Sequence, residues 1–185
     1  MIITEIVPQK NTDRVNIFID GEFSLGLSIF LAHEYSLKVG KFIDDELMEK
    51  LKEDDIFNNA KMKAFRYLSY KDRSIKEMED YLLKKEYSPH IINLTISYML
   101  DNDYLNDKRF AENFIQGKSK YNNYGPRKIK YDLMNKGIGK EIIDLCLDDF
   151  DEDLEEIIDL VNRKYEKLKD APYNKQYNTI GGFLS

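Results

Sequence analysis

The sequence has 185 residues, of which 42% are hydrophobic and 34% are charged, and its formal net charge is −6. This apolar fraction supports several small cores, so a chain that is disordered throughout is excluded. No apolar run approaches the roughly 18 residues of a membrane span, and no charged-then-apolar leader follows Met1. We therefore expect no membrane span, no signal peptide and a cytoplasmic protein.

The net charge conceals a segregation along the chain. Residues 1–59 carry −6, residues 60–140 carry +7 and residues 141–170 carry −8. A basic central segment can meet phosphates or an acidic protein surface, and acidic flanks limit indiscriminate binding to nucleic acid. Solvated helices that simply differ in charge would produce the same asymmetry.

The amino-terminal segment, residues 1–56, is predicted to combine a small sheet with two helices. Apolar residues alternate with polar ones, and Asp20-Gly21 marks a tight turn. The expected elements are strands at 2–7, 15–19 and 23–27, a helix from Ile29 and a helix from Asp44 past Leu51. Such a small sheet is marginal alone and must pack on the helices. We expect this module to extend a partner surface or cap the next unit rather than carry chemistry.

A repeat of 51 residues follows. Shifting the sequence by 51 places Met78 on Ile129, Leu82 on Leu133 and Lys85 on Lys136. Further matched pairs are Ala60 with Ala111, Ala64 with Ile115, Ile91 with Ile142, Ile92 with Ile143, Leu94 with Leu145, and Ile96 with Leu147. Fixed-period self-similarity of this length predicts a repeat protein.

Helix start and stop signals divide each repeat into three short helices. Ser74 and Gly125 suit N-cap positions, Pro126 suits the first helical position, and Gly137 and Ser88-Pro89 mark ends and starts. One such unit exposes an apolar face that only a neighbour can cover. The prediction is a mainly α protein whose tandem three-helix repeats form an elongated, curved body, preceded by the small β-hairpin and helix module.

We expect domains at 1–56, 57–104, 105–150 and 151–185, the last an incomplete third repeat. Its Tyr173–Ser185 segment matches the second helix of a repeat, but no closing helix follows. Gly181-Gly182 weakens that helix by about 1 kcal/mol per glycine relative to alanine. The sequence leaves open a truncated chain or an omitted disordered tail, and we expect reduced stability at this terminus.

No catalytic or metal-binding constellation is found. His33, His90 and Cys146 are isolated, and Cys146 lies between leucines as a buried structural thiol would. The acidic run 149–153 lacks the glycine and glutamate of a calcium loop, and residues 137–140 lack the pattern of a phosphate-binding loop. We expect no cofactor, no metal and no enzymatic activity.

The densest basic and aromatic cluster falls in the second repeat, around Tyr121. Its cations can hold phosphates and its rings can stack on bases or arginines. The predicted partner- or DNA-binding residues are Arg109, Lys118, Lys120, Tyr124, Arg127, Lys128 and Lys130. In the alternative interpretation Tyr124 packs beneath Pro126 to fix a turn. Ile129, Leu133 and Met134 are expected in the core.

Two motifs resemble the RecX regulators of the RecA recombinase. They are Tyr104–Ala111 (YLNDKRFA) and Tyr124-Gly125-Pro126 through Lys136-Gly137. Residues 15–23, followed by an apolar helix and Gly40, resemble the β-hairpin extension of some members. The likeness covers almost the whole chain.

This resemblance implies a monomer that acts in DNA repair and recombination by binding rather than catalysis. Its implied partner is the RecA filament on single-stranded DNA, whose extension, ATP turnover and strand exchange it would restrain, with possible direct DNA contact. The motif positions carried over are Tyr124, Gly125, Pro126, Arg127, Lys136 and Gly137, most of them fold-setting and Arg127 the best interaction candidate. A helical nucleic-acid-binding protein that needs no recombinase, and a plain scaffold, stay open as alternatives.

Overall fold

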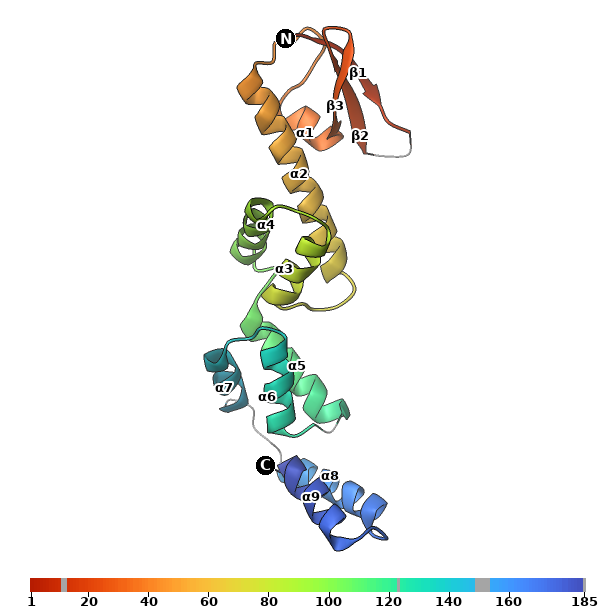
Figure 1. Cartoon of the computed structure of the whole chain (residues 1–185), viewed down its shortest axis with the longest axis vertical. Coiled ribbons are helices and arrows are strands. Elements are labelled where there is room, and N and C mark those ends of the chain that lie inside the picture. The colour runs from red at the N-terminus through yellow and green to blue at the C-terminus, as the bar shows by residue number, and fades with distance from the viewer. Residues whose placement is uncertain (11–12, 123, 149–153, 185) are drawn as a thin grey trace. The chain divides into compact units, whose positions relative to one another are not determined.

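The computed structural model describes the backbone of residues 1–10, 13–122, 124–148 and 154–184, and their side chains except those of 119–122, 154–160 and 183–184. The strands are β1 (Ile3–Pro8), β2 (Arg14–Ile19) and β3 (Glu22–Ser28). The helices are α1 (Ile29–Glu34), α2 (Asp45–Leu68), α3 (Ile75–Lys84), α4 (Pro89–Asp101), α5 (Asp107–Asn122), α6 (Pro126–Asn135), α7 (Lys140–Asp148), α8 (Leu154–Leu168) and α9 (Tyr173–Leu184) (Figure 1). A mainly α fold with a small amino-terminal sheet is confirmed.

The chain divides into two compact units. One unit comprises residues 1–67 and 86–95, and the other comprises residues 68–85 and 96–185. None of the helices in the described ranges is both long enough and apolar enough to cross a membrane.

The amino-terminal sheet is antiparallel, in the order β1-β2-β3. In β2 burial alternates strictly, because Val15, Ile17 and Ile19 face the core while their neighbours are half-buried. The core also includes Ile3, Leu25, Leu27, Ile43, Met48 and Leu51. The three predicted strands and the helices predicted from Ile29 and Asp44 lie near their observed bounds, because alternation and turn residues act locally.

Asp55 joins helix α2 to the sheet. Its carboxylate accepts hydrogen bonds from both terminal nitrogens of Arg14, at 3.1 and 2.7 Å, and from the Ser28 backbone N–H at 3.1 Å. Asn59 Nδ2 donates to the same carboxylate at 3.1 Å. Asp55 is only 8% exposed, so a charged group is buried here with every partner in place.

The core of the second repeat lies between α5, α6 and α7. It contains Phe110, Ala111, Ile115, Ile129, Leu133, Ile138, Ile143 and Cys146. The predictions that Ile129, Leu133 and the Cys146 thiol are buried are confirmed. The same prediction for Met134 is wrong, because Met134 is 54% exposed. Ile129 and Leu133 are four residues apart and share the buried face of α6. Met134 follows Leu133 directly, so the helical rotation of about 100° per residue turns it away from that face.

The predicted helix signals are confirmed at α3 and α6. Ser74 caps α3 in a capping box, since its Oγ accepts from the Glu77 N–H while the Glu77 carboxylate accepts from the Ser74 N–H. Helix α6 starts at Gly125 with Pro126 in its first turn, and Gly137 follows its end with φ of +82°.

Helices α8 and α9 form a pair whose turn is fixed by Gln176. Its Nε2 donates to the carbonyl oxygens of Lys169 at 3.1 Å and Ala171 at 2.8 Å. The helix predicted from Tyr173 is present, whereas the acidic run 149–153 lies outside the described residues. Between residues 161 and 182 no side chain is buried, so the described part of this pair has no closed core of its own.

Candidate interaction surface

Most of the predicted binding residues come together on α5 and α6 in the second unit. Lys118 lies on α5, Tyr124 lies in the connection to α6, and Arg127, Lys128 and Lys130 lie in the first turns of α6. The Lys120 side chain lies outside the described residues.

Cations and aromatic rings alternate across this surface. The Lys118 ammonium nitrogen lies 5.5 Å from the centre of the Phe114 ring and 5.2 Å from that of Tyr124. Lys128 lies 5.8 Å from Tyr124 and 5.4 Å from Tyr131. Lys136 lies 5.7 Å from Phe110 and 5.8 Å from Phe114. We call this set the cation–aromatic row: Tyr131, Lys128, Tyr124, Lys118, Phe114, Lys136 and Phe110. Each spacing falls in the range of cation–π attraction, which orders the flexible lysines.

Two of the predicted cations on α6, Lys128 and Lys130, are held by carboxylates. Lys128 Nζ donates to Asp132 Oδ1 at 2.7 Å, and this hydrogen bond raises the pKa of Lys128. Lys130 donates to Asp144 and so ties α6 to α7. Because Lys130 joins two helices of one repeat, it has a structural role that the sequence pattern did not reveal.

Among the predicted cations whose side chains are described, Arg127 and Lys118 are left for a partner. Across the residues whose side chains are described, neither has a carboxylate partner. Arg127 is exposed and Lys118 is half-buried between its two rings. A recess of about 280 Å³ adjoins the row, because Phe110, Phe114 and Lys136 belong to its lining. The surface thus offers positive charge, the exposed Tyr131 ring and a recess, while Phe110 anchors the row in the core.

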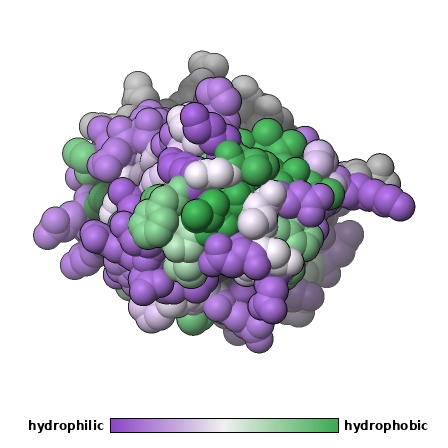
Figure 2. Space-filling view, turned by 90° about the horizontal axis from the view of Figure 1, so that it is seen from above, coloured by the Kyte–Doolittle hydropathy of each residue, from purple (hydrophilic) through white to green (hydrophobic). Residues whose placement is uncertain are grey.

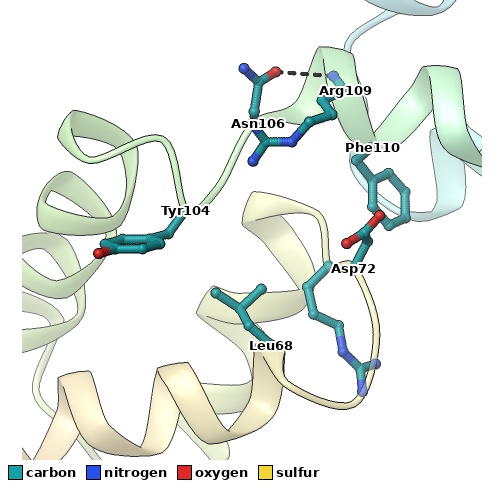
Figure 3. Close-up of a pocket in the computed structure, with 7 residues that line it drawn as sticks. Leu68, Asp72, Tyr104, Asn106, Arg109 and Phe110 are labelled. Carbon is teal, nitrogen blue, oxygen red and sulfur yellow. Dashed lines mark hydrogen bonds between the residues drawn. The ribbon is translucent and has the colours of Figure 1, made fainter.

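Arg109 lies apart from the row and braces the start of α5. Its guanidinium donates to the Asp103 carboxylate and to the Asp103 carbonyl oxygen, the latter at 2.7 Å. Hydrogen bonds from Asn106 and then Arg109 hold the pKa of Asp103 below its ordinary value. Figure 3 shows Arg109 and Phe110 on α5 beside a polar pocket, with Asn106 Oδ1 accepting from the Arg109 backbone N–H at 3.0 Å. This arrangement gives Arg109 a role in the α4–α5 connection.

The first repeat provides an internal comparison. The shift of 51 residues places Lys76 on Arg127, Glu77 on Lys128, Glu79 on Lys130 and Asp80 on Tyr131. Both α3 and α6 are helices of 10 residues with the same buried pair, Met78 and Leu82 in one and Ile129 and Leu133 in the other. Since the same buried pair occurs with acids in α3 and with bases in α6, burial of that pair does not require the basic character of α6.

The start of α3 is joined to the end of α6. Ser74 Oγ donates to the Lys136 carbonyl oxygen at 2.7 Å, and Lys136 Nζ donates to Glu77 Oε1 at 2.6 Å. A Cβ at Gly137 would lie 2.5 Å from Lys76 Cβ, so both its positive φ and its surroundings require glycine. We call Ser74, Lys76, Glu77, Lys136 and Gly137 the repeat junction. It explains the motif Lys136-Gly137 as fold-setting.

Two carboxyls, Glu77 in the repeat junction and Asp107 next to it, have pKa values shifted in opposite directions. Burial would raise the pKa of Glu77, but the hydrogen bond and charge of Lys136 hold it below its ordinary value. Burial raises the pKa of Asp107, whose Oδ1 accepts from the Ile75 N–H at 2.9 Å. These shifts have structural causes, and no group of three or more His, Cys, Asp or Glu within the described ranges could hold a metal ion.

Sequence reasoning missed Phe110, Phe114 and Tyr131 as members of the row. A signal for them exists, because Phe110, Phe114 and Lys118 recur every four residues on α5, where such residues share a face. The contact between Lys118 and Tyr124 depends on the connection between two helices, which spacing along one helix does not predict.

Comparisons with known proteins agree over most of the chain. Family models match for the regulatory protein RecX N-terminal domain at residues 1–44, the first RecX three-helix domain at 60–99 and the second at 106–147. Regulatory protein RecX of Clostridioides difficile (strain 630) is 32% identical over 187 residues, which cover 100% of this chain and 88% of that protein. The Clostridium beijerinckii protein of the same name is 35% identical, with coverage of 94% and 79%. The Listeria innocua protein is 35% identical over 84% of this chain, but only 58% of its own length is matched.

Solved structures show the same fold. A crystal structure of regulatory protein RecX superposes with a TM-score of 0.79 at 20% identity, covering 98% of this chain and 91% of that one. The crystal structure of RecX from Lactobacillus salivarius gives a TM-score of 0.62 at 28% identity, covering 71% and 86%.

Proposed function

The chain belongs to the RecX family of regulatory proteins, and from that premise we propose that it binds a RecA filament on single-stranded DNA and restrains its extension, ATP turnover and strand exchange. The observation that supports the proposal is the cation–aromatic row with Arg127 beside it, because Lys118 and Arg127 have no carboxylate partner among the described side chains. A filament on DNA presents phosphates and carboxylates, and both are recognised by such cations.

The proposed action is binding. The relatives are named as regulatory proteins, and the ATP whose turnover changes belongs to the recombinase. Contact patches that are spread along one chain combine through effective concentration. Weak contacts at each unit therefore add to firm binding, and a few bound copies can slow a filament of many subunits.

Arg127 and Lys118 are proposed to touch the partner directly. Lys128 and Tyr124 are proposed to order the row around them, because Lys128 is already paired with Asp132 and Tyr124 is half-buried against the core. Arg109 and Lys130 are proposed to act only through the fold. In this division, the predicted residues whose charge has no carboxylate partner among the described side chains bind, and the others support them.

The test is ATP turnover by the RecA recombinase of the same organism on single-stranded DNA, with this protein titrated well below one copy per recombinase subunit. We expect inhibition at that ratio, and a rise of about tenfold in the half-inhibiting concentration for Arg127→Ala with Lys118→Ala. Lys52→Ala is the matched control, since Lys52 is 48% exposed but lies on the acidic α2. Absence of inhibition by the folded wild-type protein in excess would refute the proposal.

A second candidate is a nucleic-acid-binding protein that needs no recombinase, and the same row favours it because rings and cations together bind single strands. Tight binding to a single-stranded oligonucleotide without recombinase would support it. With phosphate contacts from Lys118 and Arg127, the logarithm of affinity should fall by roughly 1.4 per tenfold rise in salt, and Arg127→Ala should reduce this slope by roughly 0.7.

A further inference from the structure

The outer face of the amino-terminal sheet, opposite the core, carries exposed apolar side chains. Ile2 and Phe42 pair in an antiparallel bridge, so their side chains lie next to each other on one face. Ile3 and Ile43, the next residues, are fully buried, which directs Ile2 and Phe42 outward. Ile2 is 48% exposed and Phe42 is 64% exposed.

A β-bulge turns Phe23 onto the same face. Register places Leu25 opposite Ile17 but Phe23 opposite Phe18, so Ser24 is the extra residue in β3. Without the bulge, Phe23 would share the inward face of Leu25 and Leu27. With it, Phe23 is 59% exposed and its ring meets that of Phe18 edge-to-face, with centroids 5.9 Å apart.

We call Ile2, Phe18, Phe23 and Phe42 the outer apolar patch. The other end of the same face is polar, because Gln9 Nε2 donates to Asn16 Oδ1 at 2.7 Å and Arg14 donates to the Gly26 carbonyl oxygen. Figure 2, which views the molecule from its amino-terminal end, shows hydrophobic side chains gathered in one area with hydrophilic ones around it. Exposed apolar patches rimmed by polar residues mark interaction sites.

Charge around the patch decides which partner fits. Glu5 lies opposite Phe18 in the sheet, and Asp20 and Glu22 flank the β2–β3 turn, all three exposed. Residues 1–59 carry a net charge of −6. Phosphates would be repelled here, although the rings alone would suit a nucleobase. A protein surface with apolar residues ringed by lysine or arginine is complementary in both respects.

We propose that the outer apolar patch docks an apolar, basic-rimmed protein surface, and, resting on the proposed function, that this surface belongs to the recombinase filament. The amino-terminal module then adds an anchor that is independent of the basic α5–α6 surface. Each of the two compact units then has one contact surface: the outer apolar patch has an acidic rim, and the α5–α6 surface is basic. A partner must therefore present a basic region to one unit and an acidic region to the other.

The experiment measures affinity for the recombinase assembled on oligo(dT), with Phe23→Ala and Phe42→Ala tested separately. Loss of an exposed ring at the centre of an interface should weaken binding at least about tenfold. Phe30→Ala is the matched control, because Phe30 is 66% exposed in the same module but lies on α1. Circular dichroism confirms folding, and the two variants lie in different segments, so misfolding of one leaves the other as a test.

The expected result is weaker filament binding by both variants, no change for Phe30→Ala, and unchanged affinity for free oligo(dT). The patch proposal is overturned if all variants bind the filament equally, or if Phe30→Ala weakens binding as much as the other two do. The proposed function still stands in either case, provided that the wild-type protein binds the filament. Loss of oligo(dT) affinity would instead assign the patch to nucleic acid, and loss of self-association in sedimentation equilibrium would assign it to a second copy. A folded wild-type protein that fails to bind the filament removes both proposals.

Discussion

Replacing Ser74 by alanine tests the repeat junction. The hydroxyl is fully buried and makes two hydrogen bonds, accepting from the Glu77 N–H at 3.1 Å and donating to the Lys136 carbonyl oxygen at 2.7 Å. Loss of the N-cap costs about 1 kcal/mol. The part-buried Lys136 carbonyl oxygen also loses the hydroxyl that donates to it, which costs about 1 to 2 kcal/mol more. We expect Ser74→Ala to lower the free energy of unfolding by about 2 to 3 kcal/mol.

Ser88→Ala is the matched control. Ser88 also caps a helix, since its Oγ accepts from the Ile91 N–H at 3.4 Å, but Ser88 is exposed. Its replacement should cost about 0.5 kcal/mol, because water replaces the lost partner. Urea unfolding followed by circular dichroism gives both values, and native-state hydrogen exchange shows whether the α6 amides lose protection. If Ser74→Ala costs no more than Ser88→Ala, the bond to Lys136 contributes nothing and the junction is explained wrongly.

Three further variants test other contacts by urea unfolding. Gly137→Ala should lower the free energy of unfolding more than Gly40→Ala does. Both glycines have positive φ, but only a Cβ at Gly137 would lie 2.5 Å from a neighbouring atom. Equal losses of unfolding free energy would contradict this close approach. Asp55→Ala should cost about 3 kcal/mol, because it leaves a partly buried arginine unpaired, and a loss under 1 kcal/mol would contradict this reasoning. Glu77→Gln should cost about 1 kcal/mol at pH 7. Because the pKa of Glu77 is lowered in the folded protein, the ion pair stabilises the fold above the ordinary pKa of 4.5, and this stabilisation is lost as pH falls through the folded-state pKa. The difference in unfolding free energy between wild type and Glu77→Gln should therefore shrink in acid. A difference that stays constant with pH would refute the ion pair.

Sequence patterns predicted the elements whose causes are local. The helix starts at Ser74 and Gly125, the end at Gly137 and the alternation of Val15, Ile17 and Ile19 depend on neighbours within one turn or strand. The repeat of 51 residues then predicted the buried pair Ile129 and Leu133 from its counterpart. These features hold because capping, φ preference and side-chain periodicity act over a few residues.

The misses involve contacts between distant residues. Ser74 meets Lys136 across 62 residues and Arg14 meets Asp55 across 41. The sequence predicted the cluster of cations as a group but not their ion pairs. Lys130, for example, contacts Asp144 only because α6 packs against α7. The bulge at Ser24 was also missed, since alternation along β3 alone directs Phe23 inward.

The repeat junction also affects how freely the helix faces can change. Hydrogen bonds at the helix ends and the glycine at position 137 fix where α3 and α6 meet, while Glu79, Asp80 and Tyr131 are exposed and take no part in those contacts. We therefore expect mutations at these three positions to leave the repeat junction in place. The outer sides of α3 and α6 can therefore carry side chains of opposite charge, as they do here, without a change in the way the two repeats are joined.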